Sequence, residues 1–236
     1  MSSKLISVIV PVYNHAHTLE RAVDSIFNQT HRPLQVVIVN DGGTDNFSKV
    51  MDKIKINYPT LDLQVINQDN SGAPAARNRG FKEAKGDYVI FWDADTIGEP
   101  FMLEKMVETL ENNAAFSYAY SQFKFGWKVM KSQEFDPVTL QKFNYIDGVS
   151  LIRRADVIPW DESLKRFQDW DLWLTMLEQK KTGINIPEVL FSKIVKGRKN
   201  ISAWLPRFVY KLPWKTKAVR AYEEAREVVL KKHGLI

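Results

Sequence analysis

Two carboxylates one residue apart, Asp93 and Asp95, directly follow a run of five apolar residues at positions 88–92. A short apolar run between a Gly-Asp pair and two acids is typical of a strand buried on both faces. Ligands of open α/β sheets bind beyond the carboxyl ends of such strands. No basic residue lies within 87–96, so the two carboxylates would repel each other unless a cation lay beside them. Because phosphate-bound divalent cations are held by one or two carboxylates, the pair indicates a metal site; the alternative is an acidic turn before the next helix.

Polar residues also end the preceding predicted strands. The apolar run at 5–10 is followed by Tyr13, the run at 34–39 by Asp41, and a third strand at 63–66 by Asn67. Apolar residues at helical spacing separate these strands, and such alternation predicts a parallel sheet with right-handed crossovers. We therefore expect these polar residues to converge with Asp93 at one edge of the sheet.

The expected elements complete an α/β domain. Helices are predicted from about 18, near 50–54, at 73–84, from 100 and from 169, and later strands at 116–125, 145–152, 184–186 and 189–195, with an irregular segment at 129–144.

Five motifs in this order resemble those of family 2 glycosyltransferases, the inverting nucleotide-sugar transferases of the GT-A fold. They are SVIVPVYN at 7–14, VNDGGTD at 39–45, ARN at 76–78, DAD at 93–95 and QDWDLW at 168–173. The resemblance covers about residues 5–195. It implies a GT-A α/β fold at 1–200, with a mostly parallel central sheet flanked by helices, and leaves 201–236 as a basic amphipathic helical extension.

The resemblance also implies a donor site. Asp41 would accept a hydrogen bond from the nucleotide base, which suits uracil or guanine N–H groups, and we favour UDP over GDP or dTDP. The alternative is an Asp that only forms a turn before two glycines. Arg77 lies in the first turn of its helix, where its charge opposes the helix dipole, so we expect the donor diphosphate beside it. The same pocket would be lined by Pro11, Tyr13 and Asn14.

The catalytic roles follow from the same resemblance. Asp95 would bind Mn²⁺ or Mg²⁺, and Asp93 would hold the ribose or the donor sugar. Asp169 would be the general base, with its pKa held low at a helix N-terminus; the alternative is an acid that only stabilises the helix. We assign that helix-stabilising role to Asp171, which points to a different face.

The chain departs from the family pattern in three places, and one of them is Gly43, where relatives usually carry Ser. Gln168 stands where relatives usually carry Glu, which keeps hydrogen bonding but removes a charge. Lys193 and further Lys and Arg residues occupy the stretch where many relatives have a His, so a diphosphate contact there would come from Lys or Arg.

Composition sets the remaining expectations. The chain has 236 residues and no cysteine, which excludes disulfides and thiolate metal sites, and we expect a cytoplasmic protein, peripheral at the inner face of the membrane. Residues 193–236 carry 12 Lys and Arg against 3 Glu, whereas 1–192 carry 21 basic against 25 acidic residues. Aromatic residues accompany the charge at 202–215, which suits an anionic membrane surface, and packing of these helices on the body is the alternative. Nucleic acid is not an expected partner, since no binding motif accompanies the charge.

The sequence therefore predicts a metal-dependent, inverting glycosyltransferase that acts on a saccharide or lipid-linked acceptor. A nucleotidyltransferase is one alternative, although the chain lacks its Gly-rich phosphate loop after the first strand. A non-catalytic, membrane-docked nucleotide-sugar-binding module is the other.

Overall fold

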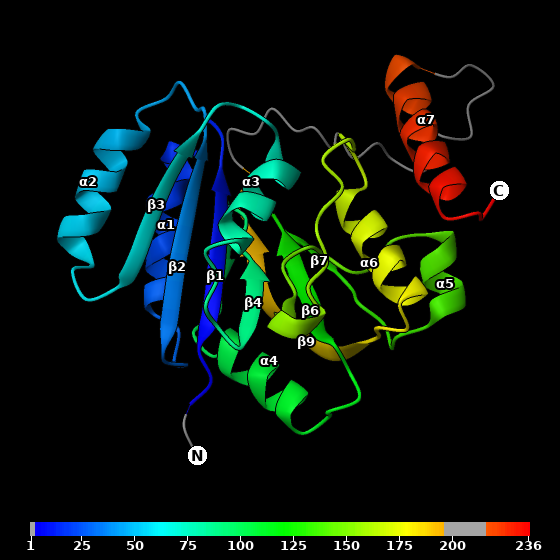
Figure 1. The fold of residues 1–236 in the computed structure, drawn as a ribbon, viewed down its shortest axis with the longest axis horizontal. Helices are drawn as coiled ribbons and strands as arrows, with labels where there is room; N and C mark the ends of the chain where they lie inside the picture. Colours follow the sequence, from blue (N-terminus) through cyan, green and yellow to red (C-terminus); the bar gives the residue numbers. More distant parts are fainter. Residues whose placement is uncertain (1–2, 196–215) are drawn as a thin grey trace.

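Four parallel strands form the N-terminal half of a nine-stranded sheet in the computed structural model, which describes residues 3–195 and 216–236 (Figure 1). They lie in the order β3-β2-β1-β4. Their bounds are Ile6–Val12 for β1, Leu34–Asp41 for β2, Asp62–Gln68 for β3 and Tyr88–Phe91 for β4. The parallel pairing places the carboxyl ends of β1, β2 and β4 at one edge, as the sequence predicted.

The second half of the sheet is mixed. It continues β4-β8-β6-β9-β5, and β7 pairs with β6 alone. Antiparallel pairing joins β4 to β8, β8 to β6 and β9 to β5, whereas β6 and β9 are parallel. The bounds are Thr96–Gly98 for β5, Tyr118–Phe125 for β6, Lys128–Met130 for β7, Leu151–Arg153 for β8 and Gly183–Lys193 for β9.

Helices cover both faces of the sheet, because the central strands are apolar on both sides. Alternate residues of β1 lie in different core clusters: Ile6, Val8 and Val10 in one, and Ile9 in the other. The first cluster includes side chains of α1 (Ala16–Phe27), α2 (Phe47–Asn57) and α4 (Met102–Glu111). The second includes side chains of α5 (Pro137–Lys142), α6 (Gln168–Glu178) and α7 (Lys217–Lys232). Helix α3 (Ala73–Phe81) packs against β1 and β2.

Two strand predictions in the second half were wrong in their extent. Residues 145–150 form a loop and only β8 is extended, because Asn144 and Asp147 bond the backbone N–H groups two residues further on, at 3.1 and 2.9 Å. Such local hydrogen bonds compete with strand pairing. The two strands predicted at 184–186 and 189–195 are the single strand β9, whose register shifts opposite Ser121 and Gln122. The segment 129–144, predicted to be irregular, contains the end of β7 and the whole of α5.

The C-terminal helix α7 lies beside α6 and α5 (Figure 1). The predicted boundary at residue 200 and the apolar residues at 202–215 lie outside the described residues. Among the residues that are described, no helix has the length and apolar character needed to cross a membrane.

Candidate active site

The last residue of β2 holds the loop that leads into α3. Asp41 is 2% exposed, and its carboxylate accepts hydrogen bonds from Gln68 Nε2 at 2.8 Å and from the backbone N–H groups of Ser71 and Gly72 at 2.9 Å each. A carboxylate has about four acceptor positions, so one remains for a ligand. Asp41 thus does more than form a turn, and its contact with a base stays a prediction.

The segment after β1 lies against the segment after β2. Asn14 has a left-handed backbone with φ 54°, a conformation that Asn tolerates, and its Oδ1 accepts a hydrogen bond from the Thr44 N–H at 2.8 Å. Pro11 belongs to β1, and Tyr13, directly after the strand, is 47% exposed. An exposed aromatic ring at this edge is able to stack on a nucleotide base.

Asp93 lies between two cations. Its Oδ1 is 3.0 Å from Arg77 Nη2, and its Oδ2 is 3.1 Å from Lys193 Nζ. Burial opposes ionisation, but the charges of Lys193 and Arg77 overcome it and hold the pKa of Asp93 well below its usual range. Asp93 is therefore a permanent anion that fixes both cations at the carboxyl end of β4.

Arg77 has three partners from distant parts of the chain. Besides Asp93, its Nη1 donates to Gln168 Oε1 at 3.1 Å, and its guanidinium lies 4.3 Å from the ring centroid of Trp160. The sequence argument placed a diphosphate beside this charge; the anion that the structure shows there is Asp93, which Arg77 shares with Lys193. Gln168 keeps its predicted hydrogen bonding, since its Oε1 accepts from Arg77.

Asp169 occupies the first turn of α6, as predicted, but its ionisation differs from the prediction. Burial and the nearby Asp147 carboxylate raise the pKa of Asp169 to about 6, and Lys193 and Arg77 only partly offset them. The helix N-terminus therefore does not hold this pKa low, because burial and a like charge outweigh it. A carboxylate with this pKa is mostly ionised at neutral pH and is a stronger base than an ordinary Asp.

Asp147 is the site residue that the sequence did not reveal. It lies in the loop that was predicted to be a strand, and its Oδ2 is 2.8 Å from Lys193 Nζ. The Asp-Gly pair at 147–148, typical of a loop, was the available signal. Lys193 had been one of several cations considered, and the structure places its ammonium between Asp93 and Asp147, which together raise its pKa.

Asp95, the predicted metal ligand, is buried at the same edge of the sheet. It is 2% exposed in the turn between β4 and β5, and its charge also acts on Lys193. Across residues 3–195 and 216–236, no group of three or more His, Cys, Asp or Glu side chains could hold a metal ion. A cation that bridges two phosphates needs only one or two carboxylates from the protein. The residues thus fit a metal that arrives with a diphosphate, not one that the chain holds alone.

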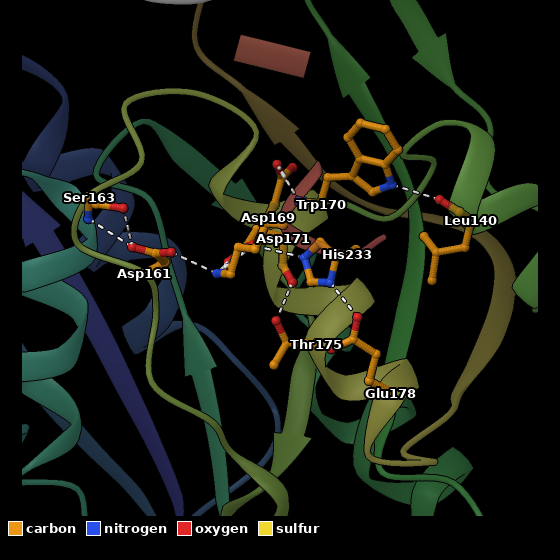
Figure 2. Close-up of polar contacts among 10 residues, drawn as sticks. Leu140, Asp161, Ser163, Asp169, Trp170, Asp171, Thr175, Glu178 and His233 are labelled. Atoms are coloured by element: carbon orange, nitrogen blue, oxygen red, sulfur yellow. Dashed lines mark hydrogen bonds and ion pairs between the residues drawn. The ribbon is translucent and has the colours of Figure 1, made fainter. Parts of the chain in front are cut away.

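Asp171 faces away from this site. Its carboxylate binds Lys232 and His233 at the end of α7, while its place in the first turn of α6 fits the predicted helix-stabilising role. Figure 2 shows that the side chains of Asp169 and Asp171 leave α6 in different directions.

Comparison with known proteins identifies the family. Residues 7–159 match the model of the family described as Glycosyl transferase family 2, and this chain belongs to that family. TuaG of Bacillus subtilis, which carries a provisional assignment to teichuronic acid biosynthesis, is 30% identical over 206 residues, with 85% of this chain and 71% of TuaG covered. The chain spans only 33%, 30% and 17% of the lengths of three other curated glycosyltransferases.

Solved structures confirm the GT-A fold. TarS of S. aureus in complex with UDP-GlcNAc superposes with a TM-score of 0.71 at 20% identity, over 87% of this chain and 63% of that chain. The mannosyltransferase PcManGT of Pyrobaculum calidifontis, in complex with GDP-Man and Mn²⁺, gives 0.67 at 19% identity, over 84% of this chain and 59% of that chain. The family and the fold predicted from the motifs are therefore both confirmed.

Proposed function

We propose that this protein is a metal-dependent, inverting glycosyltransferase of polysaccharide or glycolipid synthesis. It transfers a sugar from a nucleoside-diphosphate donor, with UDP favoured over GDP and dTDP, to a hydroxyl of a saccharide or lipid-linked acceptor. The observation that carries the proposal is the position of Asp169, a carboxylate with a pKa near neutrality, among the Asp93, Arg77 and Lys193 charges at the carboxyl edge of the sheet.

The reaction would be an in-line displacement, in which the acceptor hydroxyl attacks from one side and the nucleoside diphosphate leaves from the other. Asp169 takes the proton of the acceptor hydroxyl, and the hydroxyl oxygen forms a bond to the anomeric carbon of the donor sugar. The bond from that carbon to the diphosphate oxygen breaks on the opposite side, and its electron pair leaves with the nucleoside diphosphate. Attack from the side opposite the leaving group inverts the anomeric configuration.

The cations of the site would act on the leaving group. Arg77 and Lys193 are held by Asp93 within reach of this edge, and each can exchange a carboxylate contact for a phosphate oxygen. Asp95 would hold Mn²⁺ or Mg²⁺, which neutralises the negative charge that develops on the diphosphate. Complexes of structural neighbours with UDP-GlcNAc, and with GDP-Man and Mn²⁺, support a nucleotide sugar as the ligand but do not select one.

On the nucleotide side, Asp41 would use its remaining acceptor position for a base N–H, and the ring of Tyr13 would stack on the base. Pro11 and Asn14 shape this part of the edge, and Asp93 would accept from a ribose or sugar hydroxyl. Since both oxygens of Asp93 already bind cations, such a contact requires its further acceptor positions.

The basic extension at 201–236 suggests a second partner, an anionic membrane surface. Residues 193–236 carry a net positive charge and residues 1–192 a net negative one, and this asymmetry supports the assignment. Co-sedimentation with vesicles of anionic and of neutral lipid tests it; equal binding to both, or to neither, would contradict it.

Calorimetric titration with UDP, GDP and dTDP, each with and without Mn²⁺, tests the donor assignment. We expect one nucleotide to bind tightly only with the metal, and Asp95→Ala to abolish the metal-dependent part. A matched turnover assay separates the enzyme from a non-catalytic binding module, which would bind a nucleotide sugar without releasing a nucleoside diphosphate. Absence of binding by all three nucleotides would contradict the donor site proposed here.

A further inference from the structure

The C-terminal helix α7 contacts the turn of α6 that carries Asp169. The Tyr222 ring packs edge-on against Phe167 with ring centroids 5.0 Å apart, and the Arg226 guanidinium lies 5.7 Å from the ring centroid of Trp170. Phe167 lies two residues before Asp169 in the sequence, and Trp170 directly follows it. Helix α7 thus contacts residues before and after the candidate base. Neither contact involves the donor-side elements β2 and α3.

The strongest of these contacts is electrostatic (Figure 2). Asp171 is 3% exposed, and its carboxylate lies 2.7 Å from Lys232 Nζ and 2.9 Å from His233 Nε2. His233 Nδ1 lies 2.6 Å from Glu178 at the other end of α6, and Lys232 Nζ also lies 2.7 Å from Asp161. An acid in the first turn of a solvent-facing helix needs no such partners, whereas a buried one is costly unless it is paired.

The backbone ahead of Asp169 is strained. Phe167, the N-cap residue of α6, has a left-handed conformation with φ 56° and makes no side-chain cap hydrogen bond. This conformation is unfavourable for a bulky residue and persists only where the surroundings enforce it. Tyr222 from α7 and Trp170 from α6 both pack edge-on against the Phe167 ring, so the constraint comes partly from α7.

Helix α6 is also held by α5 and by the loop that carries Asp147. Trp170 Nε1 donates to the Leu140 carbonyl at 2.6 Å, and Trp173 Nε1 donates to the Ile146 carbonyl at 3.1 Å, next to Asp147. Helix α6 is therefore held between the loop that carries Asp147 and the end of α7. A change in its seating would move Asp169 relative to Asp147, which sets its ionisation.

We propose that Lys232 and His233 are positioning residues for glycosyl transfer, which act through Asp171 to seat the first turn of α6 and so to place Asp169. The proposal rests on the transfer reaction proposed above. The positioning role affects the base and not donor binding, because Asp41 and Asp95, the residues proposed to bind the donor and its metal, lie outside α6. Loss of the contact is expected to lower kcat and to leave the affinity for the donor nucleotide unchanged.

The test uses Lys232→Met and Asp171→Asn, with Lys231→Met as the matched control. Lys231 loses the same charge, but its side chain is 65% exposed and pairs with Glu227 one turn earlier on α7. Turnover is measured as release of nucleoside diphosphate from the donor that titration identifies, with water as acceptor. We expect kcat to fall about tenfold or more in the first two variants, since small misplacements of a catalytic group cost this much. Donor affinity should stay within about twofold of wild type, and Lys231→Met should behave as wild type.

Three further measurements separate positioning from general destabilisation. Lys232→Arg, which keeps the charge, should recover most of kcat. The double variant Asp171→Asn with Lys232→Met should lose no more than either single variant, because both remove one interaction. Hydrogen exchange at the N–H of Asp171, which bonds the Phe167 carbonyl at 2.9 Å, should quicken in Lys232→Met and not in Lys231→Met.

Folded Lys232→Met with kcat within about twofold of wild type would overturn the proposal, as would equal losses in Lys231→Met. If Asp171→Asn does not fold, Lys232→Met and Lys232→Arg decide the question. A wild-type protein that binds a donor but never turns it over would contradict the proposed function itself, which separates that failure from failure of the positioning role.

Discussion

Four charged side chains next to the candidate base decide its chemistry. Burial raises the pKa of Asp169 most and Asp147 adds to it, while Lys193 and Arg77 lower it, and Asp93 holds both cations in place. Each pair contact is between 2.8 and 3.1 Å, so the electrostatic balance depends on residues from four separate parts of the chain. The base is therefore tuned by its neighbours more than by the helix dipole.

The pH dependence of turnover follows from this balance. A general base works only when ionised, so kcat/KM, which reports the free enzyme, should rise with pH through a midpoint of about 6 and level off above it. Asp169→Asn should bind the donor normally and lose transfer by a factor of about 10² or more. Asp147→Asn removes the like charge, so its midpoint should lie below that of the wild type.

Measurement of kcat/KM across the acidic limb in both proteins checks this prediction. Equal loss of donor binding and of transfer in Asp169→Asn would show that Asp169 belongs to the donor site and not to the acceptor side. An unchanged midpoint in Asp147→Asn would show that burial alone sets the pKa.

Sequence reasoning at this scale found residue types and missed their mutual contacts. Asp93 and Asp95 were visible because they directly follow an apolar run, and Asp169 because it lies in the QDWDLW motif of the family resemblance. Asp147 was not, because it lies in a loop whose sequence, YIDGVSLI at 145–152, has the apolar character of a strand. The raised pKa of Asp169 depends on burial and on Asp147, which no local pattern reports.

The elements of the N-terminal half were predictable for a physical reason. Buried parallel strands are continuous apolar runs, and β1, β2 and β4 each have one. In the mixed half, β8 has only three residues and β9 contains a register shift, so neither has a regular pattern to detect. Hydrogen bonds from backbone N–H groups to the side chains of Asn144 and Asp147 make the segment before β8 a loop.

The close packing of α3 on the sheet depends on Gly80. A Cβ atom at Gly80 would lie 2.4 Å from Cγ2 of Ile9 in β1 and 3.2 Å from Cγ2 of Val39 in β2. Ile9 is fully buried, so it cannot move aside freely. Gly80→Val should lower the free energy of unfolding by about 1–3 kcal/mol, the usual cost of overpacking a core.

Because α3 also carries Arg77, the same change should weaken donor binding by displacing Arg77 from Asp93. Urea unfolding and donor titration measure the two effects. Lys82→Val, at an exposed position just beyond α3, is the control for a β-branched residue in this segment. Unaltered stability of Gly80→Val would mean that α3 can shift at no cost, which would contradict the close packing described here.

At the scale of the whole molecule, the basic C-terminal part of the chain meets the acidic body at α6. The basic C-terminal helix returns to the acidic body, and Lys232 and His233 reach Asp161, Asp171 and Glu178. The charge asymmetry was visible in the sequence, but the partners of Lys232 and His233 were not, since they lie 55 to 71 residues away in the sequence. Only the fold brings them together, and it does so beside the turn that carries Asp169.

The contacts of His233 with Asp171 and Glu178 make the free energy of unfolding depend on pH. Burial alone would lower the pKa of His233, but the hydrogen bonds to Asp171 and Glu178 overcome it and raise the pKa. Because the pKa of His233 is raised in the folded state, protonated His233 adds its full contribution to the free energy of unfolding below its unfolded-state pKa of about 6.5. That contribution is lost as pH rises through the folded-state pKa. Lys232 stays charged throughout this range, so it does not mask the change.

The free energy of unfolding of the wild type should therefore fall, relative to that of His233→Gln, as pH rises from about 6 to above the folded-state pKa. Urea unfolding of both proteins over this range gives the difference directly, with His17→Gln, at an exposed position of α1, as the control. A parallel pH dependence in wild type and His233→Gln would show that the histidine is already neutral in its contact with Asp171. The attachment of α7 to α6 would then depend on Lys232, and the positioning of Asp169 would be insensitive to pH across the range in which Asp169 itself titrates.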